Sequence, residues 1–151
     1  MKTATDIDPA IQEAYNKTKG NLFYKKGAGF LGSLLGQVRF KWTRDIPTAA
    51  ISHNELIWNP DFFESLDKDT RVTVLAHELW HNALAHGLRR GNRCPDIWNI
   101  AGDHVINLLL KEHGYYMDGF PYVMDDQFIG MSTDEIYDIL IAPGSPPMPQ
   151  P

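Results

Sequence analysis

The chain has 151 residues, which favours a single domain and is long enough to bury a core without disulfide bonds. Its single cysteine, Cys94, excludes an internal disulfide framework and any cluster of cysteine metal ligands. The formal charge of −5, from 14 basic and 19 acidic side chains, argues against a general nucleic-acid-binding surface.

No targeting or membrane segment is visible in the sequence. The N-terminus has no apolar stretch behind it, so it does not have the pattern of a secretory signal. The apolar runs, such as residues 108–110, are far too short to span a bilayer. We therefore expect a soluble cytoplasmic protein with neither a membrane nor a nucleic acid as its partner.

The first two predicted elements are helices. Asp8 can cap a helix that begins at Pro9, where the missing N–H of proline costs nothing, and Gly20 is expected to end it. The glycine-rich stretch over residues 27–36 fits a short helix or a loop, and its apolar side chains favour the helix.

Three strand patterns follow, over residues 38–42, 48–52 and 55–58. They contain aromatic and β-branched side chains, and the first alternates between apolar and polar residues. His53-Asn54 has the length of a hairpin turn, which predicts antiparallel pairing of the last two strands. The sheet is therefore expected to be small and mostly antiparallel.

The remaining elements are predicted to be helical, so the fold class is α+β. A short turn over residues 60–66 precedes a long helix from residues 69–70 to Gly87. A second helix is expected from Pro95 to Gly114, and a capping box at Ser132 and Glu135 begins the last one. Five of the nine residues from Pro143 onward are proline, which prevents helix and strand formation. These patterns predict one domain over residues 1–141 and a linker or disordered tail over 142–151.

The pattern that carries chemistry is HExxH, over residues 77–81. Residues four apart differ by about 40° around a helix axis, so His77 and His81 project from one face and can both bind one Zn²⁺. Glu78 lies about 100° further round, where its carboxylate can reach a water on the metal and act as general base.

A catalytic zinc usually has three protein ligands, and Asp103 is the favoured third. Asn99, Asp103 and Asn107 are spaced by four residues and form one polar stripe on the second long helix. The loop between the two helices is short, so antiparallel packing would turn this stripe towards the HExxH face. In the alternative reading Asp103 accepts a hydrogen bond from a ligand histidine without binding the metal.

Other side chains compete for the third position. His86 lies about 180° from His77 on a continuous helix and could join the site only if the helix broke before it. No glycine separates His81 from His86, so the ordinary reading of His86 is a cation near a helix C-terminus. His104, Cys94 and His113 are weaker candidates.

These motifs together resemble a bacterial and phage family of metallopeptidase domains found N-terminal to von Willebrand factor A-like domains. The resemblance covers most of residues 8–141. The residues that carry it are 77–86 (HELWHNALAH), 89–91 (RRG), 98–107 (WNIAGDHVIN), 46–50, 59–60, 130–132 and 135–137.

The resemblance implies a zincin-like fold, a zinc ion and hydrolysis of peptide bonds. It assigns the metal to His77 and His81 and the general base to Glu78, and its HExxH…WNxxxD pattern supports Asp103 as a ligand. It also implies a von Willebrand factor A-like domain as a partner. In zincin-like folds an extended peptide lies along an edge strand beside the motif helix, and the nearest candidate is residues 55–58.

The sequence therefore predicts a zinc-dependent metallopeptidase that acts on a peptide or protein substrate. Two alternatives stay open. One is a metal-stabilised binding module without turnover, which would use a fourth protein ligand such as His86. The other is a zinc amidase that acts on a non-peptide substrate in a closed pocket.

Overall fold

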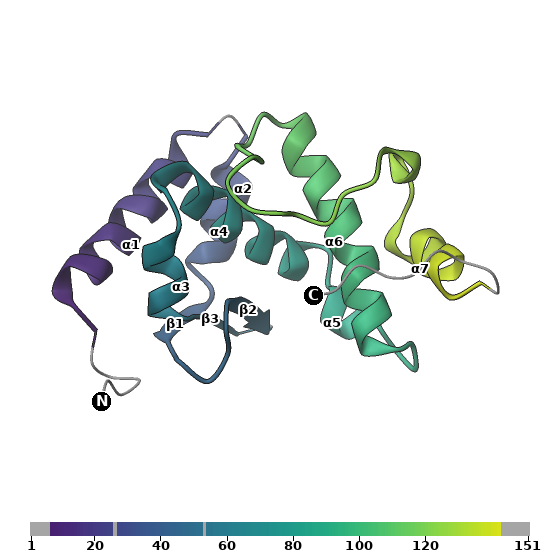
Figure 1. The fold of residues 1–151 in the computed structure, drawn as a ribbon, viewed down its shortest axis with the longest axis horizontal. Helices are drawn as coiled ribbons and strands as arrows, with labels where there is room; N and C mark the ends of the chain where they lie inside the picture. The colour runs from purple at the N-terminus through teal and green to yellow at the C-terminus, as the bar shows by residue number, and fades with distance from the viewer. Residues whose placement is uncertain (1–6, 26, 53, 143–151) are drawn as a thin grey trace.

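A computed structural model describes residues 7–25, 27–52 and 54–142 of the chain. The predictions for the N-terminal segment before residue 7, for His53 and for the tail from residue 143 lie outside these ranges. The described residues form helices and a small sheet, which confirms the α+β class (Figure 1). In chain order the elements are α1 (Pro9–Phe23), α2 (Gly29–Leu35), β1 (Arg39–Trp42), β2 (Ala49–Ser52), β3 (Glu55–Trp58), α3 (Pro60–Ser65), α4 (Lys68–Ala83), α5 (His86–Arg89), α6 (Pro95–Glu112), η1 (Asp126–Phe128) and α7 (Thr133–Ile141).

The first two helices form where the sequence predicts them, but α1 is longer than expected. Asp8 accepts a hydrogen bond from the backbone N–H of Ala10 at 2.9 Å, and Pro9 occupies the first helical position. The helix continues past Gly20 to Phe23, so the predicted end was wrong. The reason is burial: Leu22 is fully buried in the core, and its packing outweighs the cost of about 1 kcal/mol of a glycine in a helix.

The sheet is mixed and has the strand order β1-β3-β2. β2 and β3 pair antiparallel, with Ser52 opposite Glu55, as the hairpin pattern predicts. β1 and β3 are parallel, with Arg39 opposite Glu55, which corrects the expectation of a mostly antiparallel sheet. β3 is the central strand, so the prediction that residues 55–58 form an edge was wrong. Its alternate side chains Leu56 and Trp58 are completely buried, which suits a strand with neighbours on both sides.

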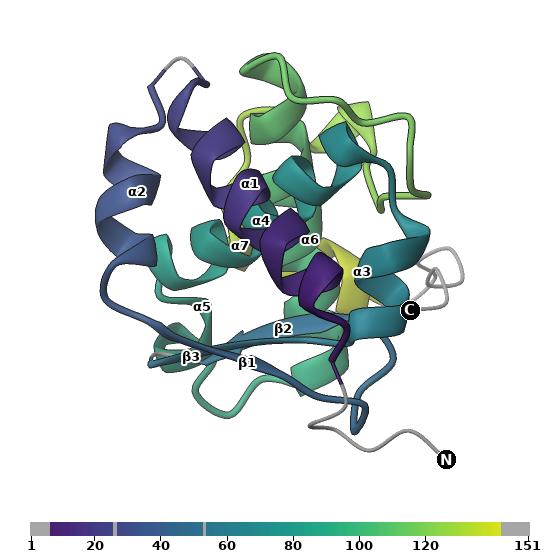
Figure 2. The ribbon, with the colours of Figure 1, turned by 90° about the vertical axis from the view of Figure 1, so that its left-hand side faces the viewer.

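An aromatic cluster joins the sheet to the helices that pack on it. Tyr15 of α1 meets the rings of Trp42, Trp58 and Phe63 edge to face, with centroids 5.7, 6.1 and 6.4 Å away. Figure 2 shows α1 crossing in front of α4, above the sheet. Because these rings bury large apolar areas, they hold α1, α3 and the sheet as one unit around α4.

The helix that carries HExxH begins at a capping residue and ends earlier than the sequence predicts. Asp67 caps α4 by accepting a hydrogen bond from the N–H of Thr70 at 2.8 Å. The helix ends at Ala83, four residues before the predicted Gly87, and Ala85 adopts a left-handed conformation with φ 53°. This reversal starts the short helix α5 at His86.

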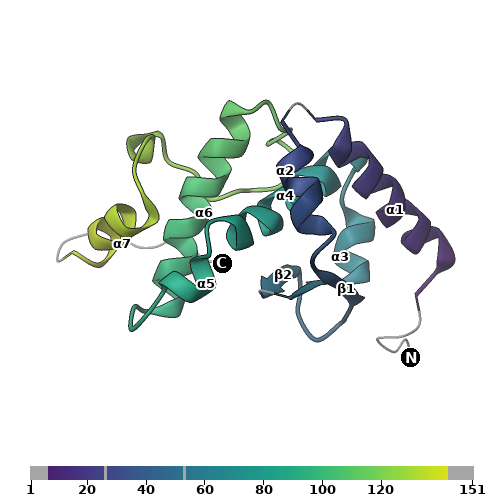
Figure 3. The same cartoon turned by 180° about the vertical axis from the view of Figure 1, so that it is seen from behind.

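The second long helix crosses α4 and contacts it in the opposite chain direction. His77 of α4 contacts Asn107 of α6, and His81, further along α4, contacts Asp103, earlier on α6. Figures 1 and 3 show the helices crossing steeply rather than lying side by side along their lengths. The chain after α6 returns across α4, where the Thr73 hydroxyl donates to the carbonyl of Tyr116 at 2.8 Å. The site residues therefore meet where the two helices cross.

The C-terminal end of the described chain packs on the outer face of α6. A second apolar cluster contains Trp98 and Ala101 of α6, Phe128 of η1, and Ile136 and Tyr137 of α7. The predicted capping box is present: Ser132 accepts from the N–H of Glu135, and the Glu135 side chain accepts from the N–H of Ser132, both at 3.2 Å. No helix in the part of the chain that the structure describes combines the length and hydropathy that spanning a bilayer requires.

Candidate metal centre

Three of the predicted site residues meet where α4 crosses α6. The Nε2 atoms of His77 and His81 lie 3.0 and 3.1 Å from Oδ1 of Asp103, and 3.1 Å from each other. Neighbouring ligands of a tetrahedral ion with bonds of about 2.0–2.1 Å are separated by roughly 3.3 Å, close to these distances. These three side chains form a group that could hold a metal ion.

Asn107 orients the outer nitrogen of His77. The Nδ2 amide of Asn107 donates to the backbone carbonyl of Val123 at 2.8 Å, which leaves its Oδ1 as the acceptor. Oδ1 lies 2.8 Å from Nδ1 of His77, so this nitrogen carries the proton. In the neutral ring, the form that can bind a metal, the lone pair of His77 is therefore on Nε2, the atom that faces His81 and Asp103.

His86 is placed differently from the sequence prediction. It is buried, with only 3% of its surface exposed, and its Nδ1 lies 3.0 Å from Nδ1 of His81. Burial lowers the pKa of His86 to about 4, and the charges of His81 and Arg89 add to the effect, so the ring is neutral at pH 7. The expectation of a cation near a helix end was wrong because α4 ends before His86 and the chain reverses at Ala85.

Charge and burial oppose each other within the group. Burial lowers the pKa of His77, but the hydrogen bond and negative charge of Asp103 outweigh it and raise this pKa to about 9. Burial raises the pKa of Asp103, but the hydrogen bonds from His77 and His81 outweigh it, so the carboxyl stays ionised. The Asp103 side chain is 30% exposed, whereas those of His77 and His81 are 12% and 16% exposed. Asp103 is therefore the most exposed of the three side chains.

Glu78 follows His77 on α4 and lies within the electrostatic influence of the group. Burial raises the pKa of its carboxyl, and the charges of His77 and His81 partly counteract this. A carboxylate with a raised pKa is a better proton acceptor near neutral pH than an exposed one.

A comparison with known families identifies the family of the chain. Residues 12–146 match a family described as "Putative metallopeptidase domain". The chain belongs to this family. A metallopeptidase domain implies a metal ion, and His77, His81 and Asp103 are the described group with suitable donors. No curated protein and no solved structure matches the chain.

The other candidate ligands of this metallopeptidase domain do not join the group. His104 is buried with its ring against Phe128, at a centroid distance of 4.8 Å, and its Nδ1 has no hydrogen-bond partner among the described residues. Cys94 and His113 are exposed at the two ends of α6. Asn99, the third member of the predicted polar stripe, is also exposed.

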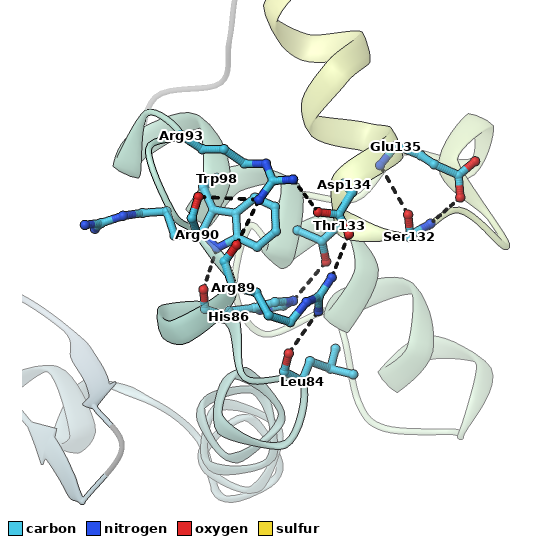
Figure 4. A network of polar contacts seen from close by, with 10 residues as sticks. All are labelled: Leu84, His86, Arg89, Arg90, Arg93, Trp98, Ser132, Thr133, Asp134 and Glu135. Carbon is cyan, nitrogen blue, oxygen red and sulfur yellow. Dashed lines mark hydrogen bonds and ion pairs between the residues drawn. The ribbon is translucent and has the colours of Figure 1, made fainter.

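Sequence reasoning missed two residues that shape the site. Gly102 lets α6 approach the histidines: a Cβ at this position would lie 2.8 Å from Nδ1 of His86 and 3.5 Å from Cε1 of His81. Thr133 lies 2.9 Å from the other nitrogen of His86, Nε2 (Figure 4). A glycine inside a helical pattern is a signal of close packing that could have identified Gly102. No local pattern indicates the role of Thr133.

Proposed function

We propose that the protein is a zinc-dependent peptidase, with His77, His81 and Asp103 as metal ligands and Glu78 as general base. The observation that carries the proposal is the approach of three donor atoms to within 3.1 Å of one another. The charges of this group also act on the carboxyl of Glu78. Membership of a metallopeptidase family supports the reaction class.

The composition of the donor group supports zinc and a catalytic site. Two imidazole nitrogens and one carboxylate oxygen suit Zn²⁺, and three protein ligands leave one position for water or substrate. A structural site would have four protein ligands, but no fourth histidine, cysteine or acid joins the group within the described ranges. His86 contacts Nδ1 of His81, not Nε2, and so lies away from the donor triangle.

The reaction that we propose divides the work among residues of α4 and α6. When bound, zinc would lower the pKa of a coordinated water towards about 7 and polarise the scissile carbonyl. Glu78 would accept the proton of the attacking water and return it to the leaving amine. Asp103 balances the positive charge of the centre, and Asn107 holds His77 in the tautomer that binds through Nε2.

The strand that we propose for substrate binding is β2. It lies at an edge of the sheet and packs beside α4, and the Asn82 side chain of α4 donates to the carbonyl of Ser52 at 3.2 Å. No strand among the described residues pairs with the other edge of β2, so backbone groups there can bind an extended peptide of any sequence. This position replaces the sequence prediction of residues 55–58. A von Willebrand factor A-like partner domain remains a prediction.

The test of the reaction compares two Glu→Gln variants of the zinc-loaded protein. Glu78→Gln removes the base but keeps the size of the side chain, so we expect release of new α-amino groups from an unfolded protein substrate to fall about 10²–10⁴-fold. Zinc content should stay at one ion per chain. Glu112→Gln, at the exposed end of α6, is the matched control and should hydrolyse like the unmodified protein. Undiminished hydrolysis by Glu78→Gln would refute the mechanism.

A further inference from the structure

A row of polar side chains connects the candidate metal centre to α7, and the proposed function gives it no role. His86 lies in the middle, with its Nδ1 3.0 Å from Nδ1 of His81. On its other side, Nε2 of His86 lies 2.9 Å from Oγ1 of Thr133, as Figure 4 shows. The residues come from the end of α4, the start of α5 and the first turn of α7. Three separate segments of the chain therefore converge on one imidazole.

The protons along this row can be assigned from the donors and acceptors. If His81 binds a metal through Nε2, which faces His77 and Asp103, its proton is on Nδ1. Nδ1 of His86 must then accept that proton's hydrogen bond, because two N–H groups cannot point at each other across 3.0 Å. The proton of His86 is consequently on Nε2, where it can donate to the hydroxyl oxygen of Thr133.

The surroundings hold His86 in one orientation. Nε1 of Trp98 donates to the backbone carbonyl of His86 at 2.6 Å, and the two rings meet edge to face with centroids 5.9 Å apart. Gly102 of α6 lies against the imidazole, where any Cβ would come within 2.8 Å of Nδ1. The ring is therefore restrained from its backbone and from the α6 side.

Ion pairs fasten α7 to the same segment. Arg89 of α5 and Arg93 of the following loop each donate to a different carboxylate oxygen of Asp134, both at 2.8 Å (Figure 4). Arg93 also lies over the ring of Trp98, at 4.7 Å from its centroid. These contacts keep Thr133, the neighbour of Asp134, within reach of Nε2 of His86.

We propose that His86 is a positioning residue for the metal ligand His81. Its Nδ1 accepts a hydrogen bond from the Nδ1–H group of His81, which keeps the Nε2 lone pair of His81 directed at the metal. Its contact with Thr133 makes the orientation of the His86 ring depend on the position of α7. The inference rests on the proposed metal site. In most zinc sites a carboxylate, carbonyl or water accepts this proton, whereas here a second histidine does.

The wild-type protein allows a test that needs no substitution. In ¹⁵N-labelled, zinc-loaded protein, we expect a scalar coupling across the hydrogen bond between the Nδ1 nuclei of His81 and His86. We also expect the ring proton of His86 on Nε2. A proton on Nδ1 of His86, or a bond from His86 to the metal, would overturn the proposal.

Substitutions at His86 test the energetic consequence. His86→Leu keeps an apolar side chain of similar size but removes the acceptor, so we expect zinc affinity to fall about 10–100-fold, measured by competition with a chromophoric chelator. His86→Asn restores an acceptor near the position of Nδ1 and should recover most of this loss. Equal affinities for His86→Leu and the unmodified protein would overturn the proposal.

His104→Leu is the matched control, because it removes another buried histidine, which packs on Phe128 of η1 and whose Nδ1 has no hydrogen-bond partner within the described chain. Its zinc affinity should be unchanged, and a loss equal to that of His86→Leu would contradict a specific role for His86. Thr133→Val keeps the volume of the Thr133 side chain but removes the hydroxyl that accepts from Nε2 of His86.

Failure of the wild-type protein to bind zinc would refute the proposed function as well as this inference. Normal zinc binding by His86→Leu would refute only this inference.

Discussion

At the scale of single residues, spacing along the helix is sufficient to bring His77 and His81 together. A separation of four residues puts two side chains on one face of any α-helix, whatever the rest of the fold. The placement of His86 could not be predicted in this way. It depends on a left-handed residue at Ala85, a conformation that costs a non-glycine residue about 1–2 kcal/mol and that packing must stabilise. Alanine carries no signal of that turn.

The metal-free protein allows a pH test of the pair formed by His77 and Asp103. Asp103 raises the pKa of His77 to about 9, above the ordinary 6.5, so an NMR titration of the ring should have its midpoint near pH 9. Asp103→Asn leaves burial as the main influence, and the midpoint should fall to 6.5 or lower.

The raised pKa of His77 also makes the free energy of unfolding of the metal-free protein depend on pH. Because the folded pKa is the higher one, the pair stabilises the metal-free fold fully below pH 6.5, and this contribution is lost as the pH rises to about 9. That loss, measured by urea unfolding, should be missing in Asp103→Asn and present in Asp138→Asn, which changes an exposed acid of α7. A His77 midpoint at or below 6.5 in the unmodified protein would contradict this account.

At the scale of elements, local signals predict where helices begin better than where they end. Asp8 and Ser132 cap the starts of α1 and α7 through the side-chain hydrogen bonds that the sequence predicts. The start of α4 was predicted at residues 69–70, and Asp67 caps it within three residues of that position. The ends of α1 and α4 depend on burial of Leu22 and on the reversal at Ala85, which are tertiary effects. The effect on stability of a glycine inside a helix likewise depends on which side chains face it.

Two glycines inside helices should respond oppositely to the same substitution. Gly20 of α1 has open space around it, so Gly20→Ala should stabilise the protein by about 0.5–1 kcal/mol through higher helix propensity. At Gly102 of α6 an added methyl would meet the imidazole of His86 at 2.8 Å, and Gly102→Ala should destabilise the protein by about 1–3 kcal/mol. Urea unfolding of both variants measures the difference, and stabilisation by Gly102→Ala would show that α6 does not approach the histidines so closely.

At the scale of the whole molecule, the arrangement of elements exceeds what periodicity can predict. The strand patterns indicate three strands and one hairpin, yet they carry no information that β1 pairs with β3 and makes it central. The steep crossing of α4 and α6 is also set by long-range packing. The crossing nevertheless brings Asp103 to the HExxH histidines, as the polar stripe and the short loop predicted. These side chains can meet at a single crossing point, so the helices do not have to pack along their whole lengths.

The central claim is that one metal ion binds where α4 crosses α6. A crystal structure of the zinc-loaded protein, with anomalous data on both sides of the zinc absorption edge, tests it most directly. We expect one strong peak within bonding distance of Nε2 of His77, Nε2 of His81 and a carboxylate oxygen of Asp103. A non-protein group should be the fourth ligand, and His86 should be hydrogen-bonded to His81. A zinc ion bound elsewhere, or one that takes His86 as a ligand, would contradict it.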